Sequence, residues 1–452
     1  MGKGNLVRGE FDQMSERRDI KVSVQPNRKV LLGEQIVIEV SGLEAQETVV
    51  IHARRIDNTD NLWYSRAVYK ANGEGIVNSA AATAVDGSYT GVDPAGLFWS
   101  MQTLRTKVEL EEFVERLPQI SDTEIGKDIL FFDIEAGNEL VGSARIEVVK
   151  ALSDVQCEQA KEESLAANFY YPKGKKDLPV IILVSGSEGG IAGQDHYGSI
   201  LASHGYATLA LAYFGLPGLP MNLEKIPLEY FEKAIKWVRK QRVVDPNKVV
   251  IMGWSKGGEL ALLLGSYFAE ISGVIAISPS HVVFQGVNMK SFHGKSSWSY
   301  GKKPLAYVPL NLWESAKVYY QISIKKQKKQ IEQLPVYEAS LNNEQAVSEA
   351  LIEVEQIKGP ILLISGEDDK MWPSTTMCEA VVKRLAANSF AHHYQHLSHP
   401  EGGHMVIGPG YSPTTYLNEA FFALGGTPAG NGRAQTKSWQ TILEFLRTNF
   451  NN

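Results

Sequence analysis

The stretch V-V-I-M-G-W-S-K-G-G-E-L, residues 249–260, decides how the fold of this chain is interpreted. An apolar run leads into the sequence G-x-S-x-G, and a second apolar run, A-L-L-L-G (261–265), begins directly after Leu260. A serine between a strand and a helix sits on a sharp turn, and small residues two positions before and after it avoid a clash where the backbone doubles back. The stretch therefore predicts a strand, a tight turn that carries Ser255, and a helix.

The second part of the chain alternates between strand and helix patterns. L-P-V-I-I-L-V (178–184) is a near-continuous β-branched run, which is typical of a strand buried on both faces of a parallel sheet. Similar runs recur at 207–214, 248–253, 273–278 and 359–366, and a helical pattern spans Leu228 to Val238. This alternation predicts a mostly parallel, doubly wound α/β sheet with right-handed crossovers.

The first part of the chain has a different texture. From Val22 to about Lys150, short alternating strands such as Q-I-V-I-E-V and S-A-R-I-E-V-V follow one another without helical patterns between them. Such a pattern favours an antiparallel, immunoglobulin-like β-sandwich. We therefore predict a tail at 1–20, a sandwich domain at 21–150, and an α/β-hydrolase domain at 151–452 with an insertion at about 281–356.

Ser255 is the candidate nucleophile, the alternative being a serine in a plain turn. Ligands bind beyond the carboxyl ends of the strands in an open parallel sheet, where this turn would stand. The backbone N–H of Lys256 would begin a helix and could donate to a developing oxyanion. A second donor is expected from the loop S-G-S-E-G-G (185–190), through the backbone N–H of Ser187 or Glu188.

A nucleophilic serine needs a base and an orienting acid, which follow it in the order acid, then histidine, in the α/β-hydrolase fold. Asp368 and Asp369 come at the end of the strand-like run P-I-L-L-I-S-G, and we prefer Asp369 because of its G-x-x-D spacing from Gly366. His404 follows E-G-G in the loop after the next strand and is the preferred base, with His399 as the alternative. The remaining histidines of this region lie in a strand-like segment, where a core or surface role is expected: His392, His393 and His396.

Composition sets the wider limits. The chain has 452 residues and a formal net charge of -6 without a long block of one sign, so neither nucleic acid nor a membrane is predicted as a partner. Its two cysteines, Cys157 and Cys378, support neither a disulfide framework nor a cysteine metal cluster and suggest a reducing compartment. The first residues lack the apolar core of a signal peptide, and a cytoplasmic location is the expectation. Catalysis by a serine with a base and an orienting acid requires no metal or redox cofactor.

Several motifs together resemble the type I acyl-CoA thioesterases and the bile acid-CoA:amino acid N-acyltransferases. S-Y-T-G-V-D-P-A-G-L-F-W-S-M (88–101) is similar to a segment near the end of the family's sandwich domain. The motifs P-L-E-Y-F-E-K-A, G-W-S-K-G-G-E-L, G-E-D-D-K-M-W-P-S and G-G-H-M stand in the family's order, and the resemblance extends from about residue 20 to 450. It implies Ser255 as nucleophile, Asp369 as acid and His404 as base.

The resemblance implies hydrolysis of a fatty acyl-CoA to a fatty acid and coenzyme A through an acyl-enzyme. The amino-acid-conjugating relatives generally carry cysteine at the nucleophile position, so Ser255 favours hydrolysis over transfer to glycine or taurine. The alternatives are an N-acyltransferase, a carboxylesterase or dienelactone-hydrolase-like enzyme, and a degenerate hydrolase that acts as a binding protein. The motifs do not determine the oligomeric state.

The insertion at 281–356 has two interpretations of equal weight. It is rich in lysines and aromatic residues, so it could cover an acyl chain and meet the anionic end of coenzyme A, or it could be a folded excursion that protects the core. Its aromatic residues are Phe284, Phe292, Trp298, Tyr300, Tyr307, Trp313, Tyr319 and Tyr320.

Overall fold

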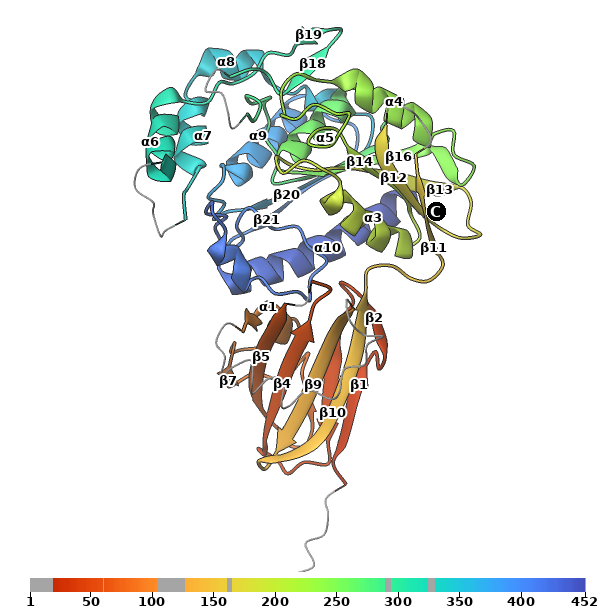
Figure 1. The fold of residues 1–452 in the computed structure, drawn as a ribbon, viewed down its shortest axis with the longest axis vertical. Helices are drawn as coiled ribbons and strands as arrows, with labels where there is room; N and C mark the ends of the chain where they lie inside the picture. The colour runs from red at the N-terminus through yellow and green to blue at the C-terminus, as the bar shows by residue number, and fades with distance from the viewer. Residues whose placement is uncertain are drawn as a thin grey trace, which may run out of the picture.

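The computed structural model describes residues 19–59, 61–104, 127–160, 165–288, 294–323 and 330–451. Nearly all of the predicted tail lies outside these ranges. So do two parts of the predicted insertion, the aromatic residue Phe292 and the K-K-Q-K-K segment at 325–329. A body of β-strands lies at one end of the molecule and a body of mixed strands and helices at the other (Figure 1).

Two sheets form the sandwich. The smaller is antiparallel, in the order β1 (Lys21–Gln25), β3 (Val37–Ser41) and β6 (Val77–Asn78). The larger has the order β2 (Lys29–Leu31), β10 (Glu139–Val149), β9 (Asp128–Ala136), β4 (Thr48–Ile56), β5 (Leu62–Lys70) and β7 (Asp86–Gly87), with β8 (Gln102–Thr103) also paired to β5. One pair, β2 with β10, is parallel, which the sequence patterns did not predict. Buried residues alternate along β5 with partly exposed ones, as expected for a strand with one face on a core.

The second body is built on one eight-stranded sheet. Its order is β11 (Val155–Gln159), β12 (Ala166–Pro172), β14 (Ala207–Ala212), β13 (Leu178–Val184), β16 (Val244–Trp254), β17 (Gly273–Ile277), β20 (Ile361–Gly366) and β21 (Tyr394–His399). The first two pairings are antiparallel and the other five are parallel. The predicted α/β-hydrolase fold with a preceding sandwich is confirmed; the domain boundary near residue 150 stays a proposal.

Helices cover both faces of this sheet, because alternate residues of each strand point to opposite sides. Ile181 and Leu183 pack in one apolar cluster with α3 (Ala192–Ser203) and α10 (Pro428–Phe450). Val180, Ile182 and Val184 pack in another cluster with α4 (Leu228–Val238), α5 (Lys256–Tyr267) and α9 (Ser374–Ala387). All residues of β13 are buried, as predicted for a strand covered on both faces.

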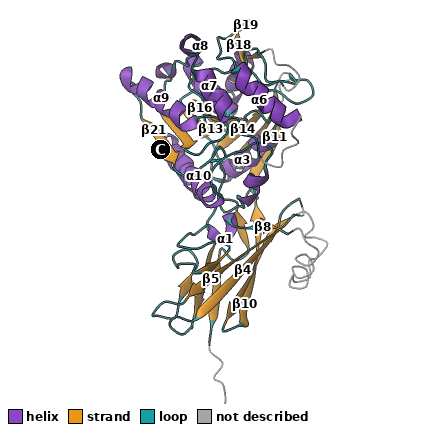
Figure 2. Ribbon diagram, turned by 90° about the vertical axis from the view of Figure 1, so that its left-hand side faces the viewer, coloured by secondary structure: helices purple, strands orange, loops and turns teal. Residues whose placement is uncertain are grey.

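The cluster on the α10 side continues into the sandwich. The short helix α1 (Gly96–Trp99) lies between the sandwich strands and α10 (Figures 1 and 2). Phe98 packs edge-on against Tyr411, with ring centroids 5.3 Å apart. The Thr414 N–H donates to the Trp99 carbonyl at 3.1 Å, and an added Cβ on Gly432 would lie 2.5 Å from Trp99 Cβ. The sandwich therefore packs on the start of α10 and on the segment that precedes it.

Residues 278–360 form an excursion between β17 and β20. They contain β18 (Trp298–Tyr300) and β19 (Lys303–Pro304), which join β15 (Ile226–Pro227) in a small sheet, and then α6 (Leu312–Ser323), α7 (Leu334–Leu341), α8 (Glu344–Glu349) and η2 (Val354–Gln356). Its aromatic residues have unlike environments, because Phe284 and Trp298 are fully buried whereas Trp313 is 72% exposed. In the described ranges, no helix combines the length and the apolar character that crossing a membrane requires.

Candidate active site

Ser255 occupies the turn that the sequence predicts, between β16 and α5. Its backbone has φ 56° and ψ -123°, a conformation that non-glycine residues rarely adopt. An added Cβ on Gly253 would lie 2.1 Å from the Gly257 carbonyl oxygen, and one on Gly257 would lie 2.3 Å from the Ser185 carbonyl oxygen. Both glycines of G-x-S-x-G are therefore required by close backbone approach.

His404 reaches Ser255 from the loop after β21. Its Nε2 lies 2.9 Å from Ser255 Oγ, and its Nδ1 lies 2.8 Å from Asp369 Oδ2. A neutral imidazole protonated on Nδ1 donates to the carboxylate and accepts the serine hydroxyl proton on Nε2. The backbone of His404 is held at both of its polar groups. The His404 N–H donates to the Leu424 carbonyl, and the His404 carbonyl accepts a hydrogen bond from Ser278 Oγ.

Asp369 is held by a turn after β20. It is 3% exposed and accepts hydrogen bonds from the Met371 and Trp372 N–H groups and from Ser374 Oγ, at 2.9, 3.2 and 2.7 Å. These three hydrogen bonds fix the orientation of the Asp369 carboxyl group toward His404. The neighbouring Asp368 is placed elsewhere, in an ion pair with Lys370 at 2.7 Å. The structure thus brings Asp369, and not Asp368, to the histidine.

The other histidines of this region lie away from Ser255. His399 ends β21, where its Nε2 lies 2.9 Å from Ser438 Oγ, and burial lowers the pKa of its imidazole to about 4. His396 lies on the same strand, with its Nε2 2.8 Å from Ser365 Oγ. His392 and His393 are exposed residues before β21. Asp368, the alternative acid, and His399, the alternative base, therefore lie outside the hydrogen-bonded chain to Ser255.

The predicted oxyanion donors come from two elements, the start of α5 and the 185–190 loop. The Lys256 N–H begins α5, and the first N–H groups of a helix have no acceptor within the helix. The 185–190 loop passes next to Ser255, since an added Cβ on Gly186 would lie 3.0 Å from Ser255 Cβ. Ser187 and Glu188 are exposed at the tip of this loop, and within the described ranges no residue accepts a hydrogen bond from either N–H group.

Two neighbours of the site were missed from sequence. Trp372 packs edge-on against the His404 ring, with centroids 5.9 Å apart, and its Nε1 donates to the Ser278 carbonyl. The Lys256 side chain is 1% exposed, and its Nζ lies 2.6 and 2.7 Å from the two carboxylate oxygens of Glu259. The K-G-G-E spacing was a signal for this i, i+3 pair, but burial of both charges is not visible in the pattern.

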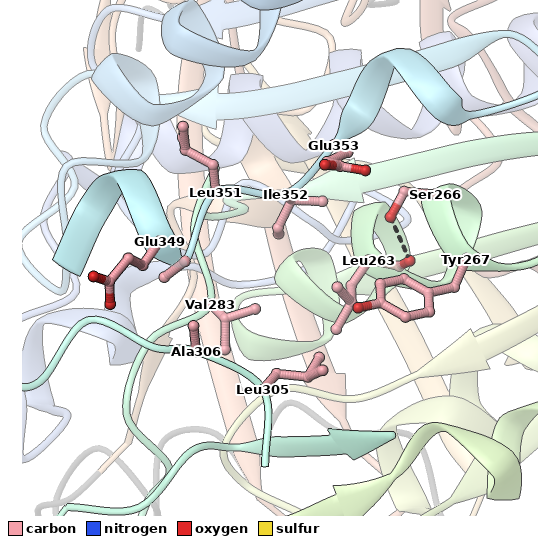
Figure 3. A pocket seen from close by; sticks show the side chains of 11 residues that line it. Leu263, Ser266, Tyr267, Val283, Leu305, Ala306, Glu349, Leu351, Ile352 and Glu353 are labelled. Carbon is pink, nitrogen blue, oxygen red and sulfur yellow. Dashed lines mark hydrogen bonds between the residues drawn. The ribbon is translucent and has the colours of Figure 1, made fainter. Parts of the chain in front are cut away.

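A cavity of about 430 Å³ lies at the other end of α5, between that helix, the 305–306 segment and the residues that follow α8 (Figure 3). Leu263 and Tyr267 line it, and Ser266 Oγ at its edge donates to the Leu263 carbonyl. Even Leu263 is eight residues from Ser255, or about 12 Å along the helix. Ser255, Asp369 and His404 are not among the residues that line this cavity.

Two family models match the chain over most of its length. The model described as "BAAT / Acyl-CoA thioester hydrolase C terminal" matches residues 226–452, and "Acyl-CoA thioester hydrolase/BAAT N-terminal region" matches residues 33–161. The chain belongs to the acyl-CoA thioester hydrolase/BAAT family. The resemblance inferred from the motifs is therefore confirmed.

Similar members of the family include three mouse proteins. Acyl-coenzyme A thioesterase 6 is 29% identical over 440 residues, which cover 95% of this chain and 97% of the relative. Peroxisomal succinyl-coenzyme A thioesterase is 26% identical, and the match covers 94% of this chain and 96% of the relative. Acyl-coenzyme A amino acid N-acyltransferase 1 is 27% identical, with 95% and 97% covered. The relatives thus carry the names of both hydrolases and transferases.

Solved structures of lower similarity were also found. Esterase B from Lactobacillus rhamnosis is 18% identical with a TM-score of 0.38, covering 66% of this chain and 86% of that one. The dienelactone hydrolase-like promiscuous phosphotriesterase P91 from metagenomic libraries is 12% identical with a TM-score of 0.39, covering 66% and 99%.

Proposed function

We propose that this protein is an acyl-CoA thioesterase that acts through Ser255, His404 and Asp369. The observation that carries the proposal is the hydrogen-bonded chain from Ser255 Oγ to His404 Nε2 and from His404 Nδ1 to Asp369, at 2.9 and 2.8 Å. A serine on a strained turn, a base within hydrogen-bond reach and a buried acid behind the base are the three parts that nucleophilic catalysis by serine requires.

In the proposed reaction, His404 takes the Ser255 proton while Oγ attacks the thioester carbonyl carbon. The carbonyl oxygen becomes an oxyanion that accepts hydrogen bonds from the Lys256 N–H and from the 185–190 loop through Ser187 or Glu188. The C–S bond then breaks, His404 gives its proton to the sulfur, and coenzyme A leaves as a thiol. Water, deprotonated by His404, attacks the carbonyl carbon of the acyl-enzyme. The bond between that carbon and Ser255 Oγ then breaks, His404 returns the proton to Oγ, and the fatty acid leaves.

The acyl-CoA substrate is inferred from family membership and from the names of the relatives. Serine at position 255 favours water as the acyl acceptor over an amino acid. A cytoplasmic location stays a prediction, and one relative carries a peroxisomal name.

The first experiment is thiol release from short to long acyl-CoA substrates by wild type and by the Ser255→Ala variant in parallel. We expect wild type to release thiol and the Ser255→Ala variant to release none. The two proteins should have the same far-UV circular dichroism spectrum. Parallel reactions with glycine or taurine test for an amide conjugate, and a simple ester with the same acyl chain tests for a general esterase. If wild type releases no thiol from any acyl-CoA, the thioesterase proposal is wrong.

A further inference from the structure

We propose that the Glu188 side chain is a positioning residue that fixes the oxyanion-side loop, residues 185–190, against the residue that precedes the nucleophile. The inference rests on the proposed function, because it assigns a role in the same reaction. It concerns the Glu188 carboxylate and is distinct from the Glu188 backbone N–H.

One carboxylate oxygen of Glu188 joins two parts of the site. Oε1 accepts a hydrogen bond from Trp254 Nε1 at 2.8 Å and another from the Gly186 N–H at 3.2 Å. Trp254 directly precedes Ser255. Gly186 lies beside the nucleophile, since an added Cβ on Gly186 would lie 3.0 Å from Ser255 Cβ and 2.7 Å from Glu188 Oε2. The carboxylate therefore joins the nucleophile turn to the loop beside the nucleophile.

The partner in this link is itself rigidly placed. Trp254 is 7% exposed and packs edge-on against Tyr197 of α3, with ring centroids 5.4 Å apart. An added Cβ on Gly193 would lie 3.1 Å from the Trp254 ring. The indole N–H is thus a fixed point against which the loop can be held.

The ends of the loop are secured by other contacts, but its tip is not. Tyr213 Oη donates to the Ser185 carbonyl at 2.7 Å, and the Gly190 N–H donates to the Phe214 carbonyl at 3.0 Å. Between them, Gly189 has φ 64°, a region that favours glycine. Within the described ranges, the hydrogen bonds to Glu188 Oε1 are the side-chain contacts that hold residues 186–188.

Loss of this link should reduce the rate of the chemical step more than substrate binding. A preorganised donor acts only where the oxyanion develops, so its displacement lowers kcat while KM changes little. A full oxyanion donor is worth on the order of 10² to 10³ in kcat, and a displaced loop should lose part of that. We expect about 10- to 100-fold lower kcat for the Glu188→Ala variant.

Three substitutions at Glu188 distinguish the effect of side-chain length from the effect of charge. Gln keeps an oxygen at the same distance and can accept both hydrogen bonds, so Glu188→Gln should stay within about 3-fold of wild type in kcat. Asp keeps the charge but is one methylene shorter, so Glu188→Asp should behave like Glu188→Ala. The matched control is Glu74→Ala, which removes an exposed glutamate in the sandwich and should change nothing.

A double-mutant cycle tests the Trp254 partner. Trp254→Phe removes the indole donor, and the Glu188→Ala/Trp254→Phe variant should be little slower than the slower single variant because both changes break one link. The proposal is overturned if Glu188→Ala keeps wild-type kcat, or if Glu188→Gln loses as much as Glu188→Ala. Fully additive losses in the cycle would also overturn it.

A second readout keeps this test independent of the substrate. The rate at which a fluorophosphonate probe labels Ser255 depends on the same donors, because the phosphonyl oxygen takes the oxyanion position. Absence of thiol release with rapid labelling would reject the acyl-CoA substrate alone. The order wild type, Glu188→Gln, then Glu188→Ala in labelling rate would still support the positioning role, and equal rates would reject it.

Discussion

Replacing Lys256 with methionine should destabilise the protein because it leaves a buried carboxylate without its counter-charge. Lys256 is 1% exposed and Glu259 is fully buried, and the two interact at 2.6 and 2.7 Å. Removing one partner of a buried ion pair typically costs about 3–5 kcal/mol. We expect about 3 kcal/mol, at the lower end, because Glu259 keeps hydrogen bonds from Trp298 Nε1 and the Phe284 N–H.

The loss should depend on pH in a defined direction. Burial raises the pKa of Glu259, which the charge and hydrogen bonds of Lys256 oppose. Without Lys256 the folded state holds a proton on Glu259 at pH values where the unfolded chain has lost it, so the stability of the variant falls as pH rises above about 4.5. The deficit relative to wild type should therefore be larger at pH 8 than at pH 5.

The assay is urea unfolding followed by far-UV circular dichroism at both pH values. The control is the Lys256→Met/Glu259→Gln variant, which removes both charges and should recover about 1–3 kcal/mol of the loss. A Lys256→Met variant within about 1 kcal/mol of wild type at pH 8 would refute the reasoning, since ordinary surface substitutions fall in that range. An equal deficit at pH 5 and pH 8 would refute the charge argument.

Three further results are expected. Asp369→Asn should lower kcat by about 10⁴ with little change in the thermal unfolding midpoint, because the amide favours the wrong histidine tautomer; near-wild-type thiol release would contradict this. Gly257→Ala should yield little soluble, active protein, because its Cβ would lie 2.3 Å from the Ser185 carbonyl oxygen; soluble expression with normal activity would show that the turn can relax. Burial lowers the pKa of His399 to about 4, so between pH 6.5 and 4 the unfolded chain binds a proton that the folded chain lacks, and stability falls by up to about 3 kcal/mol as pH falls through that window. Burial also lowers the pKa values of His196 and His281 to about 4, so His399→Gln should reduce but not abolish the slope of stability against pH in urea unfolding across the same range. An unchanged slope would reject the contribution of His399.

Features set by short-range pattern could be predicted from the sequence. The strand, turn and helix around Ser255 follow from one contiguous stretch, and Asp369 and His404 follow strands whose carboxyl ends meet at one edge of the sheet. The environment of each side chain depends on distant residues and could not be predicted in this way. Trp298 Nε1 donates to Glu259, 39 residues away, and nothing in the spacing indicates that contact.

In the excursion at 278–360, the burial of the aromatic residues could likewise not be predicted from the sequence. Phe284 stacks on Trp372 with ring centroids 6.0 Å apart, and both are buried next to the site, whereas Trp313 faces solvent. Aromatic content alone gives no indication of which rings fill the core. The parallel pairing of β2 with β10 was missed for a related reason, because it joins residues 118 positions apart, such as Lys29 and Glu147.

The apolar cluster shared by the sandwich and α10 determines what can be treated as a module in protein engineering. Residue 150 separates two kinds of sheet along the chain, but it does not separate two cores, since Phe98 and Tyr411 lie in one cluster. That cluster also reaches Val406, two residues beyond the catalytic candidate His404. A chimaera that exchanged only the α/β part would expose apolar surface on both sides of the junction, so the transplantable unit is the whole chain.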